Sequence, residues 1–317
     1  MIDKGTEVEY VAAGGNVPHH GLLPDKAARQ WSGLRKEFTA QWRASEDPLS
    51  RRRIVDLSGC LEKLEATLLQ ARRIREYHDR LISQARSLKA TLFQGTAFQG
   101  SDACADFEGF LLHGRASLDR LTWFIGRHFK NPVSSFRRIK NVLSDFEGKS
   151  SEAAELLEMV GSADAWFDGL FGKLESPQSL RDIVAHHHAL VEGTRTCFGV
   201  QRISDESALL IDCEVELPGL DARLPVLKTT NDSIGYLAFL ILNSVAVFMD
   251  VERLPFQDYA TTWANLGIAI SDYVIRVPVG SLHGEHTLFT VRRMTPDGFE
   301  FGTDNVDPSI FERRFSL

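Results

Sequence analysis

Residues 179–188 hold the densest set of reactive side chains in this sequence. Arg181 is followed by three consecutive histidines at positions 186–188. An arginine keeps its positive charge at any accessible pH, whereas an imidazole takes up and releases protons near neutral pH. Phosphodiester cleavage uses both kinds of group, because negative charge that develops on the phosphate must be stabilised and protons must move. The segment is therefore a candidate site for phosphodiester chemistry, and such a pair requires no metal ion.

Helical periodicity places these side chains around one predicted helix. At about 100° per residue, one apolar face collects Leu180, Ile183, Val184, Leu190 and Val191. His187 falls in the middle of that face, so we expect it in the core. Arg181 and His188 lie on one border of the face, and His186 lies near the other border, about 140° from Arg181. A surface arginine with solvated histidines is the alternative that these residues leave open.

Two segments carry a resemblance to a known family. The stretch Arg181 to His186 resembles the R-x4–6-H motif of the HEPN superfamily (higher eukaryotes and prokaryotes nucleotide-binding), and the spacing fits all three histidines. Residues 107–119, FEGFLLHGRASLD, resemble the first core helix of many bacterial HEPN proteins, which carry an aromatic-rich stretch and then an Arg–Ser–Leu–Asp pattern. Order and spacing agree over roughly residues 102–192.

The resemblance implies a function and a mechanism. Active members of the family are metal-independent endoribonucleases that form homodimers, in which two motifs line one cleft. By resemblance, Arg181 stabilises phosphate charge and His186 acts as acid or base while the RNA 2′-hydroxyl attacks, which leaves a 2′,3′-cyclic phosphate. We favour His186 because its spacing is the commoner one, and His188 is the rival because it shares a border with Arg181. Neither a cofactor nor a metal is expected.

The resemblance also implies partners. Many relatives are toxins or defence nucleases, so the expected partners are an RNA substrate, a second copy of the chain and an antitoxin or regulatory protein. Other relatives have lost catalysis and serve as RNA-binding or protein-binding modules, which is the alternative function. Upstream, Arg115 and Asp119 are four residues apart, and we expect a helix-face ion pair or a buried orienting pair.

Composition limits the class of protein. The 317 residues are 43% hydrophobic and 25% charged, which is globular usage and excludes collagen-like or wholly disordered chains. The net charge of −7 excludes a basic nucleic-acid coat protein. Four widely spaced cysteines indicate no disulfide framework, and residues 1–10 lack the apolar stretch of a secretory signal. We therefore expect a cytoplasmic protein.

The predicted fold is α+β and predominantly α. We expect an irregular leader over residues 1–30, a helical HEPN-like domain over 31–192 and a small β-containing domain over 193–317. A stripe of apolar residues at 3–4 spacing predicts one long helical arm over 54–92. Strands are predicted at 197–203, 208–217, 272–279 and 287–293, and a loop at 93–101. The apolar run near 232–250 predicts a helix buried against a sheet, with no membrane span.

Charge is segregated along the helical part. Residues 113–140 hold seven Lys or Arg and the single acid Asp119, whereas residues 141–180 hold eight acids and two lysines. Solvated helix faces that complement one another and a basic strip that meets phosphate are both consistent with this pattern. No P-loop or dinucleotide-binding glycine pattern occurs, so nucleotide-driven chemistry is not expected.

Overall fold

The computed structural model describes the larger part of the chain. It covers residues 22–87, 95–99, 101–161, 165–172, 179–186, 190, 197–202, 207–211, 214–216, 223–259, 277–280, 286–295, 298–302 and 315–316. Helices account for most of these residues, which confirms the prediction of a predominantly helical chain.

The helices and strands have the following bounds. The helices are α1 (Asp25–Ala44), α2 (Pro48–Ser87), α3 (Ser101–His128), α4 (Ile139–Ser144), α5 (Ser151–Gly161), α6 (Ala165–Phe171), α7 (Leu180–His186) and α9 (Val226–Met249), with 3-10 turns η1 (Phe136–Arg138) and η2 (Phe256–Asp258). The strands are β1 (Gly95–Gln99), β2 (Cys197–Arg202), β3 (Ser207–Ile211), β4 (Glu214–Glu216), β5 (Arg223–Pro225), β6 (Val277–Gly280), β7 (His286–Thr295), β8 (Gly298–Gly302) and β9 (Phe315–Ser316).

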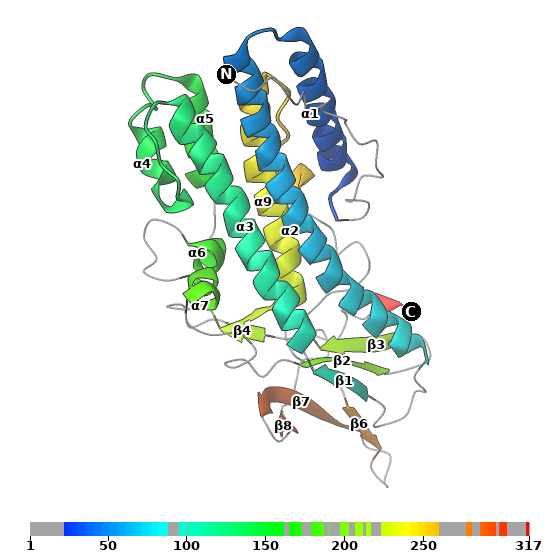
Figure 1. Cartoon of the computed structure of the whole chain (residues 1–317). Coiled ribbons are helices and arrows are strands. Elements are labelled where there is room, and N and C mark those ends of the chain that lie inside the picture. Colours follow the sequence, from blue (N-terminus) through cyan, green and yellow to red (C-terminus); the bar gives the residue numbers. More distant parts are fainter. Residues whose placement is uncertain are drawn as a thin grey trace, which may run out of the picture.

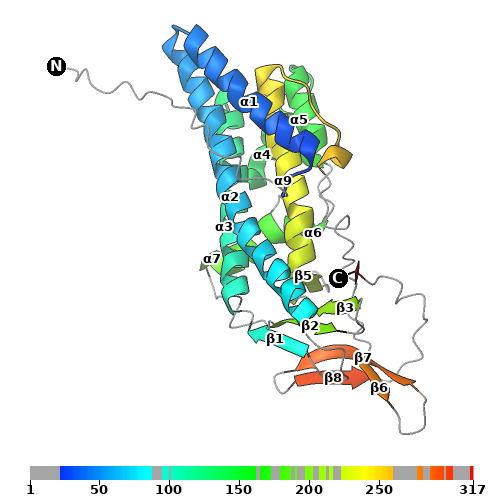
Figure 2. The same ribbon diagram turned by 90° about the vertical axis from the view of Figure 1, so that its right-hand side faces the viewer.

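Three long helices, α2, α3 and α9, lie side by side and form the bundle, with α1 and α5 packed against α9 (Figures 1 and 2). The predicted apolar stripe is buried over the first part of α2, at Ile54, Leu57, Leu61, Leu64, Leu68 and Ala71, and the predicted residues 88–92 lie outside the described part of the chain. Helix α3 buries a face at helical spacing as well, with Phe107, Leu111, Leu118, Leu121 and Ile125 each at most 1% exposed. α2 is therefore the predicted long helix, and its stripe packs in the bundle core against α3 and α9.

Helix α1 corrects the prediction of an irregular leader over residues 1–30, because it begins at Asp25 within that segment. Pro24 directly precedes the helix with φ −58°, and a proline is compatible with a helix start although it breaks a helix interior. Trp31, Leu34 and Phe38 follow at helical spacing and are each at most 1% exposed. Burial of this face against the bundle stabilises α1.

Helix α9 completes the core of the bundle. We expected a sheet to cover it within a separate unit that begins at residue 193, but its main neighbours are α2, α3, α1 and α5. Helices on several sides bury an apolar helix all round, which a single sheet face does not do. The segment Thr229–Met249 has the length and hydropathy of a membrane span, the sole such helix among the described residues, but 78% of an 18-residue apolar stretch within it is buried inside the protein.

The polar residue Asn243 in α9 forms hydrogen bonds through both its amide nitrogen and its amide oxygen inside the bundle. It is 2% exposed. Its Nδ2 donates to the Leu254 carbonyl (2.8 Å), and its Oδ1 accepts from the Leu254 N–H (3.1 Å) and the Tyr259 hydroxyl (2.7 Å). Gln30 of α1 also donates to this oxygen, at 3.1 Å. These bonds offset the cost of burying an amide and fasten the segment after α9 to α1.

The strands lie at one end of the bundle (Figure 2). The four-stranded sheet has the order β1-β2-β3-β9, and two further sheets pair β4 with β5 and β6-β7-β8. The sequence predicts an all-helical first half with a loop over residues 93–101. That prediction is wrong at residues 95–99, which form the strand β1. Residues 95–99 pair antiparallel with β2, with Gly95 opposite Gln201, because ladder bonds to a distant segment outweigh local glycine content.

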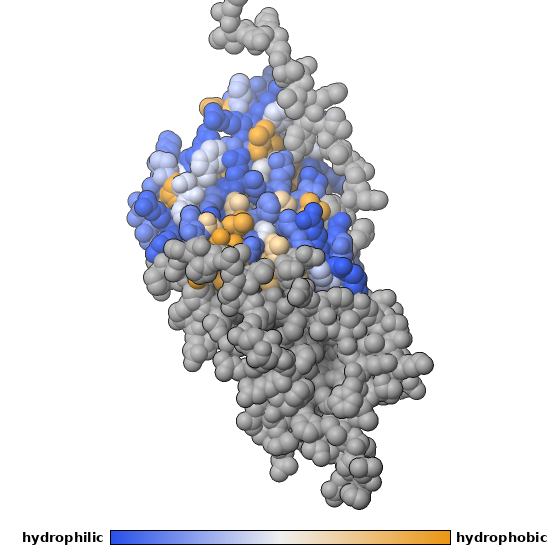
Figure 3. All heavy atoms as spheres, turned by 60° about the horizontal axis from the view of Figure 1, so that its bottom comes forward, coloured by the Kyte–Doolittle hydropathy of each residue, from blue (hydrophilic) through white to orange (hydrophobic). Residues whose placement is uncertain are grey.

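Hydrophilic side chains cover most of the described surface in the view of Figure 3. Large apolar side chains are nonetheless exposed at separate places on the helices and on η2, namely Leu49, Val55, Leu69, Leu112 and Phe256. Single exposed apolar residues are common on folded proteins and by themselves indicate no binding surface.

Candidate functional site

The helix that carries Arg181, α7, begins with a reciprocal cap. The backbone N–H of Asp182 donates to Ser179 Oγ at 3.2 Å, and the Ser179 N–H donates to Asp182 Oδ2 at 3.4 Å. This capping box satisfies two amides that the first turn of a helix leaves unpaired. The helix packs on α3 and α6, with Leu180 only 3% exposed. The cap therefore fixes where Arg181 stands relative to the bundle.

Arg181 is partly buried and bound to a neighbouring carboxylate. Its Nη1 donates to Asp182 Oδ1 at 2.9 Å, and its side chain is 26% exposed. Its Nε is buried and has no hydrogen-bond partner among the described residues. Burial raises the pKa of Asp182, but hydrogen bonds from Arg181 and Ser179 outweigh burial and hold that pKa below its usual value. The carboxylate thus stays ionised and orients the guanidinium.

His186 is the last residue of α7 and is exposed to solvent. It lies five residues beyond Arg181, so the two side chains leave the helix in directions about 140° apart. His187 and His188 lie outside the described residues. The core position of His187 and the choice between His186 and His188 stay predictions. Beyond them, the N–H of Leu190 donates to Glu108 Oε1, which ties this segment to α3.

Arg115 is the most extensively bonded charged side chain near α7. It is 6% exposed, and its Nε donates to Asp119 Oδ1 at 2.9 Å. The same carboxylate oxygen accepts the Phe136 N–H at 2.6 Å. The prediction left open a helix-face pair or a buried orienting pair, and Arg115 is buried. Asp119 is 29% exposed and holds η1 as well as Arg115.

The remaining donors of Arg115 bind two other segments. Nη1 donates to the carbonyls of Phe171 and Gly172, the latter at 2.9 Å, at the end of α6. Nη2 donates to Ser135 Oγ at 2.8 Å, just before η1. One guanidinium thus joins α3, η1 and the segment after α6. The four-residue spacing in the sequence predicts that Asp119 is a partner of Arg115. The backbone carbonyl partners could not be predicted, because every residue has a carbonyl.

Gly172 shows how close this guanidinium lies to the cap of α7. Its φ is +78°, which favours glycine. A Cβ at this position would lie 2.8 Å from Arg115 Nη1, 3.2 Å from Ser179 Oγ and 3.5 Å from Asp182 Oδ2. Arg115 and the capping box of α7 therefore meet around Gly172, with no room for a side chain between them.

Arg120 and Arg127 form a separate surface cluster with Trp123. Both guanidinium groups lie over the Trp123 ring, 4.4 and 4.6 Å from its centroid. Both also pair with Asp56 on α2, at 3.2 and 3.4 Å. The shared carboxylate partly neutralises these two members of the basic segment 113–140. Arg115 is a third member whose charge is engaged inside the protein.

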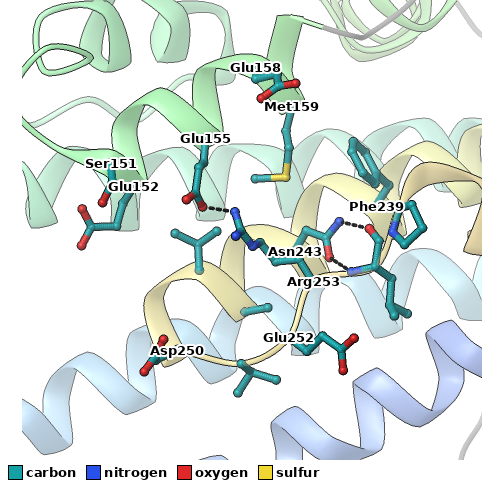
Figure 4. A pocket seen from close by; sticks show the side chains of 15 residues that line it. Ser151, Glu152, Glu155, Glu158, Met159, Phe239, Asn243, Asp250, Glu252 and Arg253 are labelled. Carbon is teal, nitrogen blue, oxygen red and sulfur yellow. Dashed lines mark hydrogen bonds and ion pairs between the residues drawn. The ribbon is translucent and has the colours of Figure 1, made fainter.

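A pocket of about 900 Å³ lies between α5, α9 and the segment after α9 (Figure 4). Neither Arg181 nor His186 lines it. Five acids do, Glu152, Glu155, Glu158, Asp250 and Glu252, and the single arginine Arg253 pairs with Glu155. The negative potential opposes phosphate binding there. Among the described residues, no group of three or more His, Cys, Asp or Glu is arranged to hold a metal ion.

Comparisons with protein-family models, curated proteins and solved structures gave no match to this chain.

Proposed function

We propose that the chain is a HEPN-like, metal-independent endoribonuclease with Arg181 and His186 as its catalytic residues. One observation carries the proposal. Arg181 stands on a capped helix with a buried Nε that lacks a partner among the described residues, and the exposed imidazole of His186 follows at the R-x4–6-H spacing. An arginine that keeps its charge and a histidine on the same short helix are the two kinds of group that RNA phosphodiester cleavage uses.

The reaction needs only the RNA, these side chains and water. The RNA 2′-oxygen attacks the adjacent phosphorus, a 2′-O–P bond forms and the bond from phosphorus to the 5′-oxygen breaks. Either His186 takes the 2′-hydroxyl proton as base and water protonates the departing 5′-oxygen, or His186 protonates that oxygen as acid and water takes the 2′-hydroxyl proton. Arg181 stabilises the added negative charge on the non-bridging oxygens. The products are a 2′,3′-cyclic phosphate and a 5′-hydroxyl end.

Further parts of the proposal rest on the HEPN resemblance. The protein acts as a homodimer in which two motifs line one cleft, works in the cytoplasm as a toxin or defence nuclease, and is regulated by an antitoxin or another protein. The strands after residue 193 lie outside that resemblance; together with β1 they form a small β-containing unit that recognises the substrate or partner. Copurification and sedimentation of the full chain test the partner and the dimer.

The decisive experiment uses the purified full chain with mixed RNA in excess EDTA. Wild type is expected to produce fragments with 2′,3′-cyclic phosphate ends. Arg181→Ala and His186→Ala are expected to lower the rate by at least about a hundredfold. His188→Ala tests the rival imidazole, and Arg127→Ala is a control that removes an arginine from the surface cluster. Absence of cleavage over a broad RNA panel, or equal cleavage by all variants, would refute this assignment.

A second candidate is a non-catalytic RNA- or protein-binding module built on the same helix. The ion pair of Arg181 with Asp182 favours it, because a guanidinium already paired with a carboxylate at 2.9 Å stabilises the negative charge that develops during cleavage less well. Asp182→Asn separates the two functions. If Asp182 only orients Arg181 in a nuclease, this variant lowers the cleavage rate, whereas in a binding module it strengthens RNA binding and no cleavage occurs.

A further inference from the structure

Arg137 and Arg138 differ from the other arginines of the basic segment 113–140. Both lie in η1, both are exposed, and neither makes an ion pair with another residue in the described part of the chain. Arg115 is buried and bonded, and Arg120 and Arg127 share the Asp56 carboxylate. The two adjacent charges of η1 are therefore available to an anion from solution.

The hydrogen bonds of Arg115 bring η1 and α7 to one place. Its Nη2 binds Ser135, two residues before Arg137, and its Nη1 binds the Gly172 carbonyl. At Gly172 a Cβ would lie 3.5 Å from the Asp182 carboxylate, which holds Arg181. Segments more than forty residues apart in the sequence thus converge on one buried guanidinium, and Arg137 and Arg181 each lie within a few residues of such a segment.

The position of η1 is fixed by the same contacts. Asp119 Oδ1 accepts the Phe136 N–H at 2.6 Å, and the Phe136 side chain is 2% exposed. Ile139, directly after η1, is 1% exposed. Buried residues on both sides therefore hold Arg137 and Arg138 at the surface in a defined place. Such pre-organisation lowers the entropy lost when a ligand binds.

We propose that Arg137 and Arg138 form a phosphate-binding subsite for a single-stranded RNA whose scissile phosphate lies at Arg181. This inference deepens the proposed function and rests on RNA being the ligand. Guanidinium groups bind phosphate oxygens through two parallel hydrogen bonds. An RNA strand carries a phosphate at every nucleotide, so a strand held at Arg181 presents further phosphates to neighbouring cations. The subsite supplies affinity without reading the base sequence.

Binding of a fluorescein-labelled single-stranded RNA to the full chain, in EDTA, tests the subsite. The variant Arg137→Gln/Arg138→Gln is expected to raise Kd roughly tenfold and to lower the slope of log Kd against log salt by about 1 to 1.5. Arg137→Lys/Arg138→Lys keeps both charges and is expected to restore most of the binding. Arg29→Gln/Lys36→Gln removes two exposed charges from α1 and is the matched control.

The outcomes separate this inference from the nuclease assignment. Weaker binding in the Arg137/Arg138 double glutamine variant than in the α1 control supports the subsite, whether or not wild type cleaves RNA. Equal Kd values and equal salt slopes in these two variants overturn it, even if Arg181→Ala abolishes cleavage. The melting temperature of each variant is measured as a control. Variants that unfold at the wild-type temperature are folded, so a change in their Kd reports RNA binding.

Discussion

Replacement of Arg115 by alanine is expected to destabilise the protein strongly, although Arg115 makes no hydrogen bond with Arg181 or His186. The guanidinium is 6% exposed and donates to one carboxylate, two backbone carbonyls and one hydroxyl. Alanine removes all four bonds at once. It also leaves the carbonyls of Phe171 and Gly172 without the donor that they have inside the protein.

The expected magnitude follows from these contacts. Hydrogen bonds to charged groups contribute about 1.5–3 kcal/mol each, and breaking a buried ion pair from one side costs about 3–5 kcal/mol. These values overlap and do not add, and Asp119 regains water because it is 29% exposed. We expect the free energy of unfolding to fall by about 3–5 kcal/mol. Arg115→Lys keeps the charge but lacks the planar fork, so we expect about half that loss.

Urea denaturation followed by circular dichroism measures this loss. The matched control is Arg127→Ala, which removes an arginine from the same helix. Its side chain is 36% exposed and its ion pair with Asp56 spans 3.4 Å, so about 0–1 kcal/mol is expected. A loss in Arg115→Ala within about 1 kcal/mol of that control would refute the view that one buried guanidinium holds α3, η1 and the segment after α6 together.

Three further predictions use matched variants or pH. Leu64→Ala on α2 is expected to cost about 2–5 kcal/mol in urea denaturation because the side chain is 0% exposed, whereas Leu69→Ala on the same helix, 44% exposed, costs under about 1 kcal/mol. Gly114→Ala is expected to destabilise by about 1–3 kcal/mol, because a Cβ there would lie 2.5 Å from an aromatic carbon of α6. In Gly33→Ala on α1, the new Cβ would have no atom within 4 Å, and alanine favours a helix more than glycine does. The free energy of unfolding is therefore expected to rise by about 0.5–1 kcal/mol, and the melting temperature with it. The lowered pKa of Asp182 means that its carboxylate stabilises the folded state above the ordinary value of 3.8 and that this contribution is lost as pH falls through the folded-state pKa. The difference in unfolding free energy between wild type and Asp182→Asn is therefore expected to be constant near neutral pH and to shrink below pH 3.8, and a difference that grows with acid would contradict the shift.

The amphipathic helices are the part of the fold that the sequence predicts best. The apolar spacing in α2 and α3 identifies the buried residues from Ile54 to Ala71 and from Phe107 to Ile125. A period of three to four residues is a local property, because side chains at that spacing share one face of a helix. The choice of a buried helix near residues 232–250 over a membrane span also agrees with the burial of α9.

Predictions that depended on a distant partner failed or stayed incomplete. The strand β1 lies in a glycine-containing segment predicted as a loop, and only its pairing with β2 makes it a strand. The helix α9 was placed against a sheet, whereas four helices surround it. Helix α1 was missed at its start because Pro24 was taken as part of an irregular segment. In each case the deciding energy comes from residues far away in the chain.

The candidate site also has a part that the sequence predicts and a part that depends on distant residues. Residue order and helical geometry are enough to predict that Arg181 and His186 occur at R-x4–6-H spacing on one short helix. The burial of Arg115 next to the cap of that helix, and its bond to Ser135 just before Arg137 and Arg138, appear only in the folded protein. The partners of Arg115 are backbone carbonyls and a serine hydroxyl. Every residue carries a carbonyl, so packing of the bundle, and no local pattern, selects the ones that a buried arginine binds.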